Sequence, residues 1–346
     1  MGDLFKDILK EEESLFLNPQ FLDYDYQPKL VPCREPQQQQ IASCIKPLLQ
    51  RRNGKNLTVL GTPGVGKTVS LKHILYELKE DYSNELFCIY LNCWKKDTSF
   101  KVITDICHQL NYKWTHNKNF EELAKAAAEL INEKSAVIIL DEVDKLQDDN
   151  IIYTLLEDIF KKTLILITNE QDFIIKLDNR IRSRLQPELL EFKPYTKEQV
   201  REILQQRVKY VFVPEVLEQE ALNIIIDKTF ESKDMRVGIF LLKQSGENAE
   251  EKSSKKITIK YAQDAINSLT ELDINNNLNS EETLLPLIKE NSGKPQSEIF
   301  KIYEEKERKS YRTFQRKLNE LKKTNKIKTK EEQGDLGKHT ILEYLD

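Results

Sequence analysis

Short apolar runs alternate with helical stretches along the first half of the chain. The runs are apolar at consecutive positions, whereas the stretches between them repeat apolar residues at helical spacing. The expected strands are residues 56–60, 87–92, 136–142 and 163–169, and the expected helices are 71–79, 99–110, 120–132 and 151–160. Strands that are apolar throughout and alternate with helices indicate an α/β fold, with a parallel sheet covered by helices on both faces.

The pattern changes after residues 189–195, where the strand-like runs stop. Thr196 and Gln199 have the spacing of a capping box, which opens a helix. Helices are expected to begin near Thr196, Pro214, Asp234 and Thr258. Residues 273–280 are polar and predict a linker. Beyond them, the sequence predicts three helices followed by two strands.

A length of 346 residues suggests two or three domains. We predict an α/β base over residues 1–190, which begins with a short N-terminal arm and has a helical insertion at about residues 97–118. An all-helical domain is expected over 191–274. The remaining domain is expected over 281–346, the region of three helices and two strands.

Composition narrows the class of protein without defining it. The chain has 53 Lys and Arg against 57 Asp and Glu, a formal charge of −4, so it is not basic all round. We found no run of about 20 apolar residues that would span a bilayer. The acidic start is unlike a secretion signal, and Lys6 stands where a myristoylation motif needs Ser or Thr. We expect a cytoplasmic protein without a membrane partner.

Cysteine and histidine spacing offers little support for a metal or nucleophile site. The five cysteines contain no CxxC pair, which disfavours zinc and favours reduced, mostly buried thiols. The four histidines are too scattered to form a ligand set by spacing.

The glycine-rich segment at residues 61–68 carries the main chemical signal. Gly61, Gly66, Lys67 and Thr68 satisfy the spacing G-x-x-x-x-G-K-[ST] between a strand and a helix. Glycines allow backbone N–H groups to turn toward phosphate oxygens, and the following helix presents its positive end. The alternative is a merely tight strand-to-helix turn. Candidate nucleotide contacts are Thr62, Pro63, Gly64, Val65, Gly66, Lys67 and Thr68.

Polar residues at two other strand ends complete the expected site. Asp141 and Glu142 end one apolar strand, and Asn169 ends the next. Asp141 would face a magnesium ion together with the Thr68 hydroxyl, and Glu142 would deprotonate the attacking water. Asn169 would position that water, although an asparagine there is also a common helix cap. The predicted ligands are ATP or ADP with Mg²⁺.

At this point the chain resembles the AAA+ ATPases. In residues 178–207, DNRIRSRLQPELLEFKPYTKEQVREILQQR, the resemblance implies an arginine finger at Arg184, with Arg182 as the second candidate. Such an arginine would act in a neighbouring copy's site, so self-association is expected; the alternative is a solvated helix-end arginine. Arg236, in the lid-like stretch DMRVGIFLLKQSGENAE, is implied to contact the γ-phosphate. The hinge stretch adds Tyr195 and Arg207 as candidate nucleotide contacts.

More narrowly, the chain resembles the archaeal replication initiators, which are related to the origin recognition complex and its cell-division-control partner. Four stretches carry the resemblance: VPCRE…NLTVLGTPGVGKT, IYLNCWKKDTSFKVITDICHQL, VIILDEVDKL and EFKPYTKEQVREILQQR. The family's lid motif reads glycine-aspartate-alanine-arginine, whereas this chain has KDMR. The resemblance implies double-stranded origin DNA and a replicative helicase as partners. It also implies DNA contacts in the insertion, for which Lys101, Lys113 and Lys118 are candidates.

Residues 308–330 form a strongly basic segment with ten Lys or Arg and one acid, Glu320. Helical spacing places Tyr311, Phe314, Leu318 and Leu321 on one face, and Arg312, Arg316, Asn319 and Lys323 on the opposite face. Two strands around a glycine-containing turn follow. This arrangement predicts a winged helix-turn-helix. Candidate DNA contacts are Arg312, Thr313, Arg316, Lys317, Lys323, Lys338 and His339. The alternative is a solvated basic helix that packs on the ATPase.

Three functions fit these predictions. The leading one is an ATP-controlled initiator, with slow hydrolysis as a switch, that binds origin duplex and helps load the replicative helicase. The second is a DNA-binding transcription regulator in which nucleotide only stabilises the fold. The third is a clamp loader or signalling AAA+ ATPase.

Overall fold

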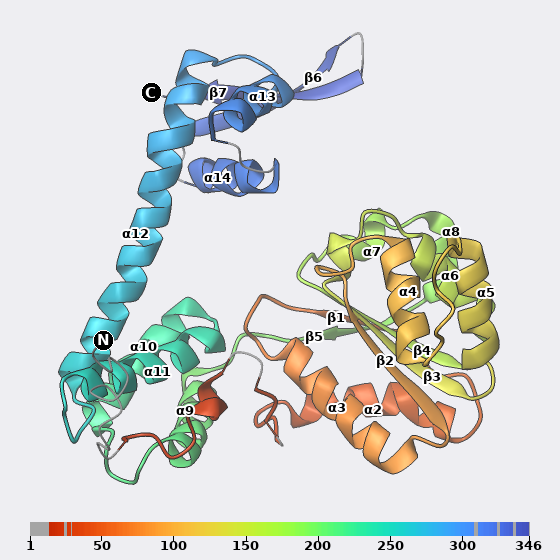
Figure 1. Ribbon diagram of the computed structural model, residues 1–346, viewed down its shortest axis with the longest axis horizontal. Helices are drawn as coiled ribbons and strands as arrows, with labels where there is room; N and C mark the ends of the chain where they lie inside the picture. Colours follow the sequence, from red (N-terminus) through yellow and green to blue (C-terminus); the bar gives the residue numbers. More distant parts are fainter. Residues whose placement is uncertain are drawn as a thin grey trace, which may run out of the picture. The chain divides into compact units, whose positions relative to one another are not determined.

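The computed structural model describes residues 14–23, 26–28, 30–307, 311–323, 326–334 and 337–345. Side chains are not described for 270–283, 307, 312–313, 316, 320, 323, 331–334 and 337–339. The chain divides into two compact units, residues 1–263 and 264–346. The first unit carries a parallel sheet and a helical lid, and the second carries helices and a hairpin (Figure 1).

The sheet of the first unit has five parallel strands in the order β2-β3-β4-β1-β5. Their bounds are β1 Leu57–Leu60, β2 Leu86–Asn92, β3 Ser135–Asp141, β4 Lys162–Thr168 and β5 Glu188–Glu191. All seven residues of β3 and of β4 are buried, because helices cover both faces of the sheet. The predicted α/β fold is therefore confirmed.

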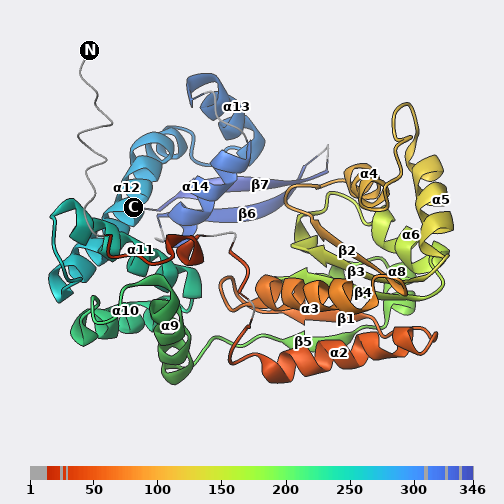
Figure 2. The same cartoon turned by 60° about the horizontal axis from the view of Figure 1, so that its bottom comes forward.

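Helices cover both faces of the sheet (Figures 1 and 2), and alternate residues of β3 and β4 belong to two separate cores. Val137 and Ile139 of β3 face α2 (Glu35–Leu49) and α3 (Lys67–Tyr82). Ile138 and Leu140 face the opposite helices. Those helices are α4 Ser99–Gln109, α5 Phe120–Ile131, α6 Asn150–Asp158, α7 Phe173–Lys176 and α8 Asn179–Leu185. Two short 3₁₀ turns complete the first unit, η1 at Pro19–Leu22 and η2 at Val143–Lys145.

The lid consists of α9 (Lys197–Val211), α10 (Gln219–Ser232) and α11 (Met235–Glu251), followed by the start of α12 (Ile259–Glu290). Both hydrogen bonds of the predicted capping box are present. The Thr196 hydroxyl accepts the Gln199 N–H, and the Gln199 side chain accepts the Thr196 N–H. The described part of the N-terminal arm packs on the lid, whereas the sequence predicted the arm as part of the base. Phe16 forms a β-bridge with Phe212, and their ring centroids lie 4.9 Å apart.

The second unit consists of the distal part of α12, α13 (Gln296–Glu307), α14 (Tyr311–Lys323) and an antiparallel pair, β6 (Ile327–Gly334) and β7 (Gly337–Tyr344). Phe314, Leu318 and Leu321 are buried in its core, on the helix face that their spacing predicted. Tyr311, the fourth residue of that face, is about half exposed and packs its ring edge-on against Phe300.

The predicted linker at residues 273–280 is wrong, because α12 continues through it without interruption. Polar composition suggested a break in the helix. However, residues 259–285 contain neither Gly nor Pro, and Asn lowers helix propensity by well under about 1 kcal/mol. A helix anchored in a core at each end therefore passes through these asparagines. The predicted domain limits of 190/191 and 274/281 stay predictions.

Candidate active site

The candidate site lies at the carboxyl edge of three adjacent strands, β3, β4 and β1. Residues 61–66 follow β1, Asp141 ends β3, and Asn169 follows β4. Because parallel strands end at the same edge of a sheet, this topology brings together residues that are about 100 positions apart in the sequence.

The glycines of the loop accommodate both an unusual backbone and close neighbours. Gly64 and Gly66 have φ of +75° and +91°, the left-handed region that favours glycine. A Cβ on Gly66 would lie 2.5 Å from the Tyr195 hydroxyl oxygen, and one on Gly64 would lie 1.9 Å from Asp234 Oδ1. The hinge and the lid therefore lie directly against the loop, which leaves no space for a side chain there.

Lys67 lies under the loop, with 7% of its surface exposed. Its Nζ donates hydrogen bonds to Gly61 O at 2.7 Å, Thr62 O at 2.9 Å and Asn169 Oδ1 at 2.8 Å. Burial lowers the pKa of Lys67 to about 8, and the positive charge of Arg236 acts in the same direction. A desolvated ammonium held mainly by neutral oxygens attracts anions strongly.

Asp141 is almost fully buried and is held by three donors. The hydroxyls of Thr68 and Tyr90 each donate to Oδ2 at 2.7 Å, and the Glu142 N–H donates to Oδ1 at 2.9 Å. Burial and the Asp141 carboxylate together raise the pKa of Tyr90, so its phenol stays protonated and serves as a donor. Tyr90 was not among the predicted site residues, although it is a polar residue near the end of a strand expected to be apolar.

Glu142 adopts a left-handed backbone with φ +54°, which turns the chain sharply away from β3. Partial burial, and then the neighbouring Asp141 charge, raise the pKa of its carboxyl group. A carboxylate with a raised pKa is a better proton acceptor near neutral pH.

The end of β4, which places Asn169, is fixed by Thr168. The Thr168 hydroxyl donates to Asp144 Oδ1 at 2.7 Å and accepts the N–H of Glu170 at 3.0 Å. Burial alone would raise the pKa of Asp144, but its hydrogen bonds from Lys145 and Thr168 lower it below the ordinary value. Asp144 thus ties the segment after β3 to the end of β4, a link that the sequence did not indicate.

The lid meets the loop at the start of α11. The Met235 N–H donates to Gly64 O at 3.3 Å, and Asp234 caps the helix by accepting the Arg236 N–H. The Arg236 guanidinium pairs with the Asp234 carboxylate, with Nε 2.9 Å from Oδ1. Asp234 lies directly against the Gly64 position, so this ion pair lies next to the loop.

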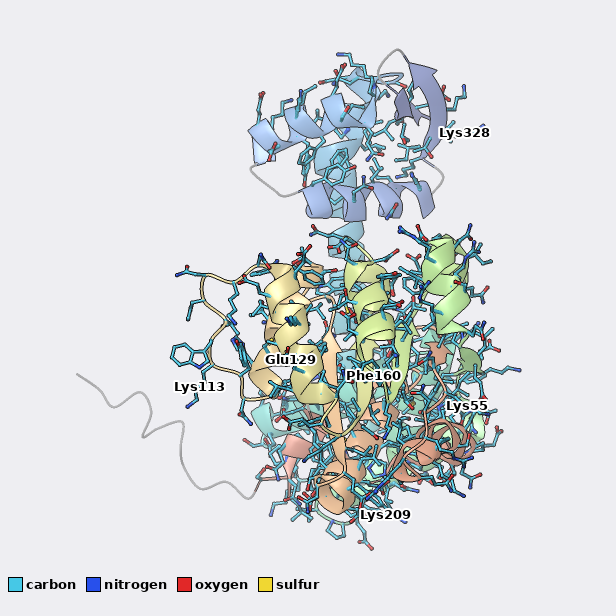
Figure 3. All side chains as sticks on the ribbon, turned by 90° about the vertical axis from the view of Figure 1, so that its right-hand side faces the viewer. Lys55, Lys113, Glu129, Phe160, Lys209 and Lys328 are labelled. Atoms are coloured by element: carbon cyan, nitrogen blue, oxygen red, sulfur yellow. The ribbon has the colours of Figure 1, made fainter. Side chains whose placement is uncertain are left out.

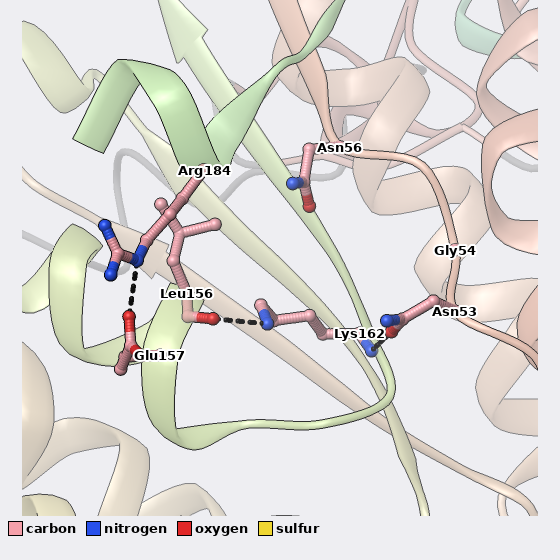
Figure 4. Close-up of a pocket in the computed structure, with 7 residues that line it drawn as sticks. All are labelled: Asn53, Gly54, Asn56, Leu156, Glu157, Lys162 and Arg184. Carbon is pink, nitrogen blue, oxygen red and sulfur yellow. Dashed lines mark hydrogen bonds and ion pairs between the residues drawn. The ribbon is translucent and has the colours of Figure 1, made fainter. Parts of the chain in front are cut away.

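Arg184 lies at the opposite, amino edge of the sheet (Figure 4). Its side chain pairs with Glu157 and lies over the Tyr153 ring, 5.3 Å from the centroid. It is 42% exposed and lines a polar hollow with Lys162, the first residue of β4. Arg184 is therefore accessible to a second molecule but is away from the Lys67 site of its own chain. Arg182, the second finger candidate, hydrogen-bonds Asn179 on the same helix.

The two hinge candidates lie in different places. The Tyr195 hydroxyl contacts the Gly66 position, next to the loop. Arg207 instead donates to Phe21 O at 2.9 Å and lies over the Tyr26 ring, so it holds the N-terminal arm.

Only part of the predicted DNA surface lies within the described residues. The side chains of Arg312, Thr313, Arg316, Lys323, Lys338 and His339 lie outside them. Lys317 is 7% exposed, and its Nζ lies over the Tyr303 ring, so it faces the core rather than solvent. Helical spacing did not predict the burial of Lys317, because spacing gives only the position of a residue around the helix. A long lysine side chain beside an apolar face can fold onto that face.

The predicted insertion consists of α4 followed by a loop over residues 110–119 (Figure 3). Lys101 pairs with Asp97 at 2.7 Å, and the Lys118 ammonium lies 5.0 Å from the Tyr112 ring centroid. Lys113 lies in the loop beside Trp114, which is 77% exposed. Trp114 was not among the residues predicted for this surface.

Two family models match the chain, one over the sheet-containing base and the next over the helical lid. An AAA domain matches residues 50–177, and a Cdc6 AAA+ ATPase-type lid domain matches residues 201–267. With the loop, the acidic strand end and the lid in place, the fold and the site define a P-loop ATPase of the AAA+ class.

Sequence relatives narrow this class. An ORC1-type DNA replication protein of Pyrococcus horikoshii is 30% identical over 282 residues, covering 75% of this chain and 67% of that protein. ORC1-type DNA replication protein 2 of Methanothermobacter thermautotrophicus is 28% identical over 343 residues, covering 94% and 90%. The chain belongs to the family of ORC1-type DNA replication proteins, which confirms the predicted resemblance.

Solved structures share the fold. The Aeropyrum pernix ORC1 protein in complex with DNA has a TM-score of 0.72 at 22% identity, covering 95% of this chain and 93% of that one. Cdc6p from Pyrobaculum aerophilum has a TM-score of 0.65 at 20% identity, covering 95% and 94%. Among the described residues, no helix is both long and apolar enough to cross a membrane.

Proposed function

We propose that this chain is an ATP-controlled replication initiator that binds origin duplex DNA and helps recruit or load the replicative helicase. The observation that carries the proposal is the contact between lid and loop, Met235 N–H to Gly64 O, beside a buried Lys67. A nucleotide at the loop would therefore touch both the base and the lid. Its phosphate state could then set their relative position.

The residues at the loop fit a nucleoside triphosphate. The loop glycines allow a backbone conformation in which N–H groups can turn toward phosphate oxygens, and the N-terminus of α3 adds a positive backbone field. The Lys67 ammonium supplies a charge that has lost most of its hydration. Solved relatives include the Aeropyrum pernix ORC2 protein in ADPNP and ADP complexes, at 17% identity.

The residues also fit a magnesium ion. The Thr68 hydroxyl and the Asp141 carboxylate, 2.7 Å apart, are oxygen donors of the kind that magnesium prefers. When bound, the ion would neutralise charge on the outer phosphates.

Hydrolysis would use groups on either side of this pair. Glu142, with its raised pKa, would accept a proton from the attacking water, and Asn169 would orient that water. Arg236 would meet the γ-phosphate from the lid, and Arg184 would act in a neighbouring copy. We propose a slow reaction that serves as a switch.

For DNA binding we propose a winged helix in the second unit. The apolar face of α14 is used in the core, so helical spacing directs Arg312 and Arg316 away from it. These arginines would read base edges and phosphates, with Lys323, Lys338 and His339 nearby. A relative with this fold was solved in complex with DNA. The exposed loop around Lys113 and Trp114 would form a second contact.

Footprinting on a library of genomic origin fragments tests DNA recognition. The double variant Arg312→Ala/Arg316→Ala is compared with Lys301→Ala/Lys306→Ala, which removes the same charge from exposed positions of α13. We expect protection to be lost only in the first, with the salt slope of binding reduced by about 0.9 per lost phosphate contact. Equal protection by all proteins would refute the assignment of the DNA surface.

A separate experiment distinguishes the switch from a structural nucleotide. Glu142→Gln should retain nucleotide and duplex binding but change helicase recruitment measured by pull-down with ATP. Recruitment that is indifferent to this substitution would favour a transcription regulator. Tight binding to a sliding clamp without duplex affinity would instead favour a clamp loader.

A further inference from the structure

Arg34 is a buried arginine directly before α2, and its side chain is directed at the phosphate loop. It is 3% exposed. Its Nε and Nη2 donate to Val65 O at 3.0 and 2.8 Å, and Nη2 also donates to Lys193 O at 2.7 Å. The guanidinium lies over the Tyr195 ring, 3.8 Å from the centroid. Three hydrogen bonds to backbone carbonyls therefore hold a charge next to the loop.

The hydrogen bonds from Arg34 to Val65 O determine the direction of the next backbone donor in the loop, the Gly66 N–H. The chain contains no cis peptide bond among the described residues, so the Val65 carbonyl and the Gly66 N–H point in opposite directions across one planar peptide. Because Arg34 binds the carbonyl on one side of the loop, the Gly66 N–H must face the other. Gly66 immediately precedes Lys67 and Thr68, so this N–H lies in the part of the loop that cradles phosphate.

Other groups bind three further carbonyls of the loop. Lys67 binds the carbonyls of Gly61 and Thr62, and Met235 of the lid binds that of Gly64. Arg34 differs from these because it also binds Lys193, in the hinge between β5 and α9. One guanidinium thus joins the segment before α2, the phosphate loop and the hinge.

Charge adds to this geometric role. A guanidinium remains charged at any pH that proteins tolerate. A Cβ on Gly66 would lie 3.8 Å from Arg34 Nε, so the charge is one atomic layer behind the loop. In a buried setting, where screening by water is weak, a permanent cation at this depth raises the positive potential felt by a phosphate.

We propose that Arg34 is a positioning residue for nucleotide binding, which fixes the Gly66 N–H toward the phosphates and couples the loop to the hinge of the lid. The inference rests on nucleotide binding at this loop. Arg34 acts through Val65 and Lys193 rather than by touching the nucleotide.

Two substitutions and one matched control test the inference. Arg34→Gln removes the charge and the two-pronged bond, whereas Arg34→Lys keeps a cation and can keep one carbonyl bond. The control is Lys162→Met. Lys162 is also a buried cation bound to backbone carbonyls, those of Leu156 and Ile159, but at the amino edge of the sheet. Calorimetry with ADP and with a non-hydrolysable ATP analogue gives affinity and the fraction of competent protein, and thermal unfolding without nucleotide gives stability.

Arg34→Gln should weaken binding of both nucleotides by about tenfold, because the Gly66 N–H is no longer held toward the phosphates and the nearby positive charge is lost. Arg34→Lys should fall between it and the unaltered protein, and the stoichiometry should stay near one in both. Lys162→Met should lower the unfolding temperature without changing affinity.

A purely structural role for Arg34 predicts a different result. The competent fraction would fall while the dissociation constant stayed the same, and this would overturn the inference. Unchanged affinity in a fully competent Arg34→Gln protein would also overturn it. If the unaltered protein bound neither nucleotide, the proposed function would fail instead, so the two failures are distinguishable.

Discussion

The buried ammonium of Lys67 makes nucleotide affinity depend on pH in a direction that follows from the structure. Its pKa lies at about 8 rather than 10.5, first because of burial and then because of the Arg236 charge; the carboxylates of Asp141, Asp144 and Glu142 only partly offset this. Phosphate oxygens beside the ammonium would raise that pKa again. Above pH 8, nucleotide binding must therefore be accompanied by uptake of a proton.

The size of the effect follows from that pKa. At pH 7 about nine tenths of Lys67 is protonated in the free protein, and at pH 9 about one tenth. Apparent affinity should therefore be about tenfold weaker at pH 9 than at pH 7. Proton uptake per nucleotide should rise from about 0.1 to about 0.9 over the same range.

The same pKa fixes the pH dependence of folding stability. The folded pKa is depressed, so the unfolded chain binds more protons between pH 8 and 10.5. The free energy of unfolding therefore rises with pH in that window. The difference between the two pKa values corresponds to roughly 3 kcal/mol for this nearly buried group. Lys67 is thus destabilising while it is charged, and nucleotide binding relieves that cost.

Calorimetry at pH 7, 8 and 9, in pairs of buffers that differ in ionisation enthalpy, measures both affinity and proton uptake. The control is Lys67→Arg, whose guanidinium stays charged throughout and whose affinity should be weaker but flat with pH. Other groups that titrate in this range, such as the nucleotide and the α-amino group, contribute the same proton uptake in both proteins. Equal affinity of the unaltered protein at pH 7 and 9, with proton uptake no greater than that of Lys67→Arg, would refute the reasoning.

Three further substitutions should have separable effects. Thr196→Ala removes the capping box and should cost about 1 kcal/mol of unfolding free energy in urea titrations, with nucleotide affinity unchanged. Tyr90→Phe removes one of the three donors to Asp141 and should raise the magnesium concentration for half-maximal ATPase activity roughly tenfold; an unchanged requirement would show that Thr68 and the backbone suffice. Gly246→Leu should displace the arm, since a Cβ there would lie 2.3 Å from Phe16, and limited proteolysis near residues 14–23 should then accelerate.

Local patterns were enough to predict the sheet and the main parts of the site. Strands β1 to β4 each contain an apolar run, and the phosphate loop and the acids Asp141 and Glu142 follow such runs directly. Since parallel strands end at one edge, their meeting also followed from the sequence. The capping box of α9 was equally local. The fifth strand, β5, has the sequence ELLE and was not among the expected strands.

The remaining contacts depend on tertiary structure, and no short pattern encodes them. Arg34 reaches a carbonyl 31 residues away, and Tyr90 reaches a carboxylate 51 residues away. Arg207 was expected at the nucleotide because of its place in a hinge motif, but the arm occupies its guanidinium. The continuity of α12 depends on the packing of its two ends, and this packing cannot be predicted from local composition.

The N-terminal arm has a consequence for how the chain folds during synthesis. Residues 14–23 are synthesised before their partners in the lid, which lie about 190 to 240 positions later in the chain. The Leu15 N–H bonds Glu250 across 235 positions, and Phe16 pairs with Phe212. The arm therefore has none of these lid contacts until most of the first unit has been translated. Docking of the arm on the lid is therefore expected to be a late step in folding of the first unit.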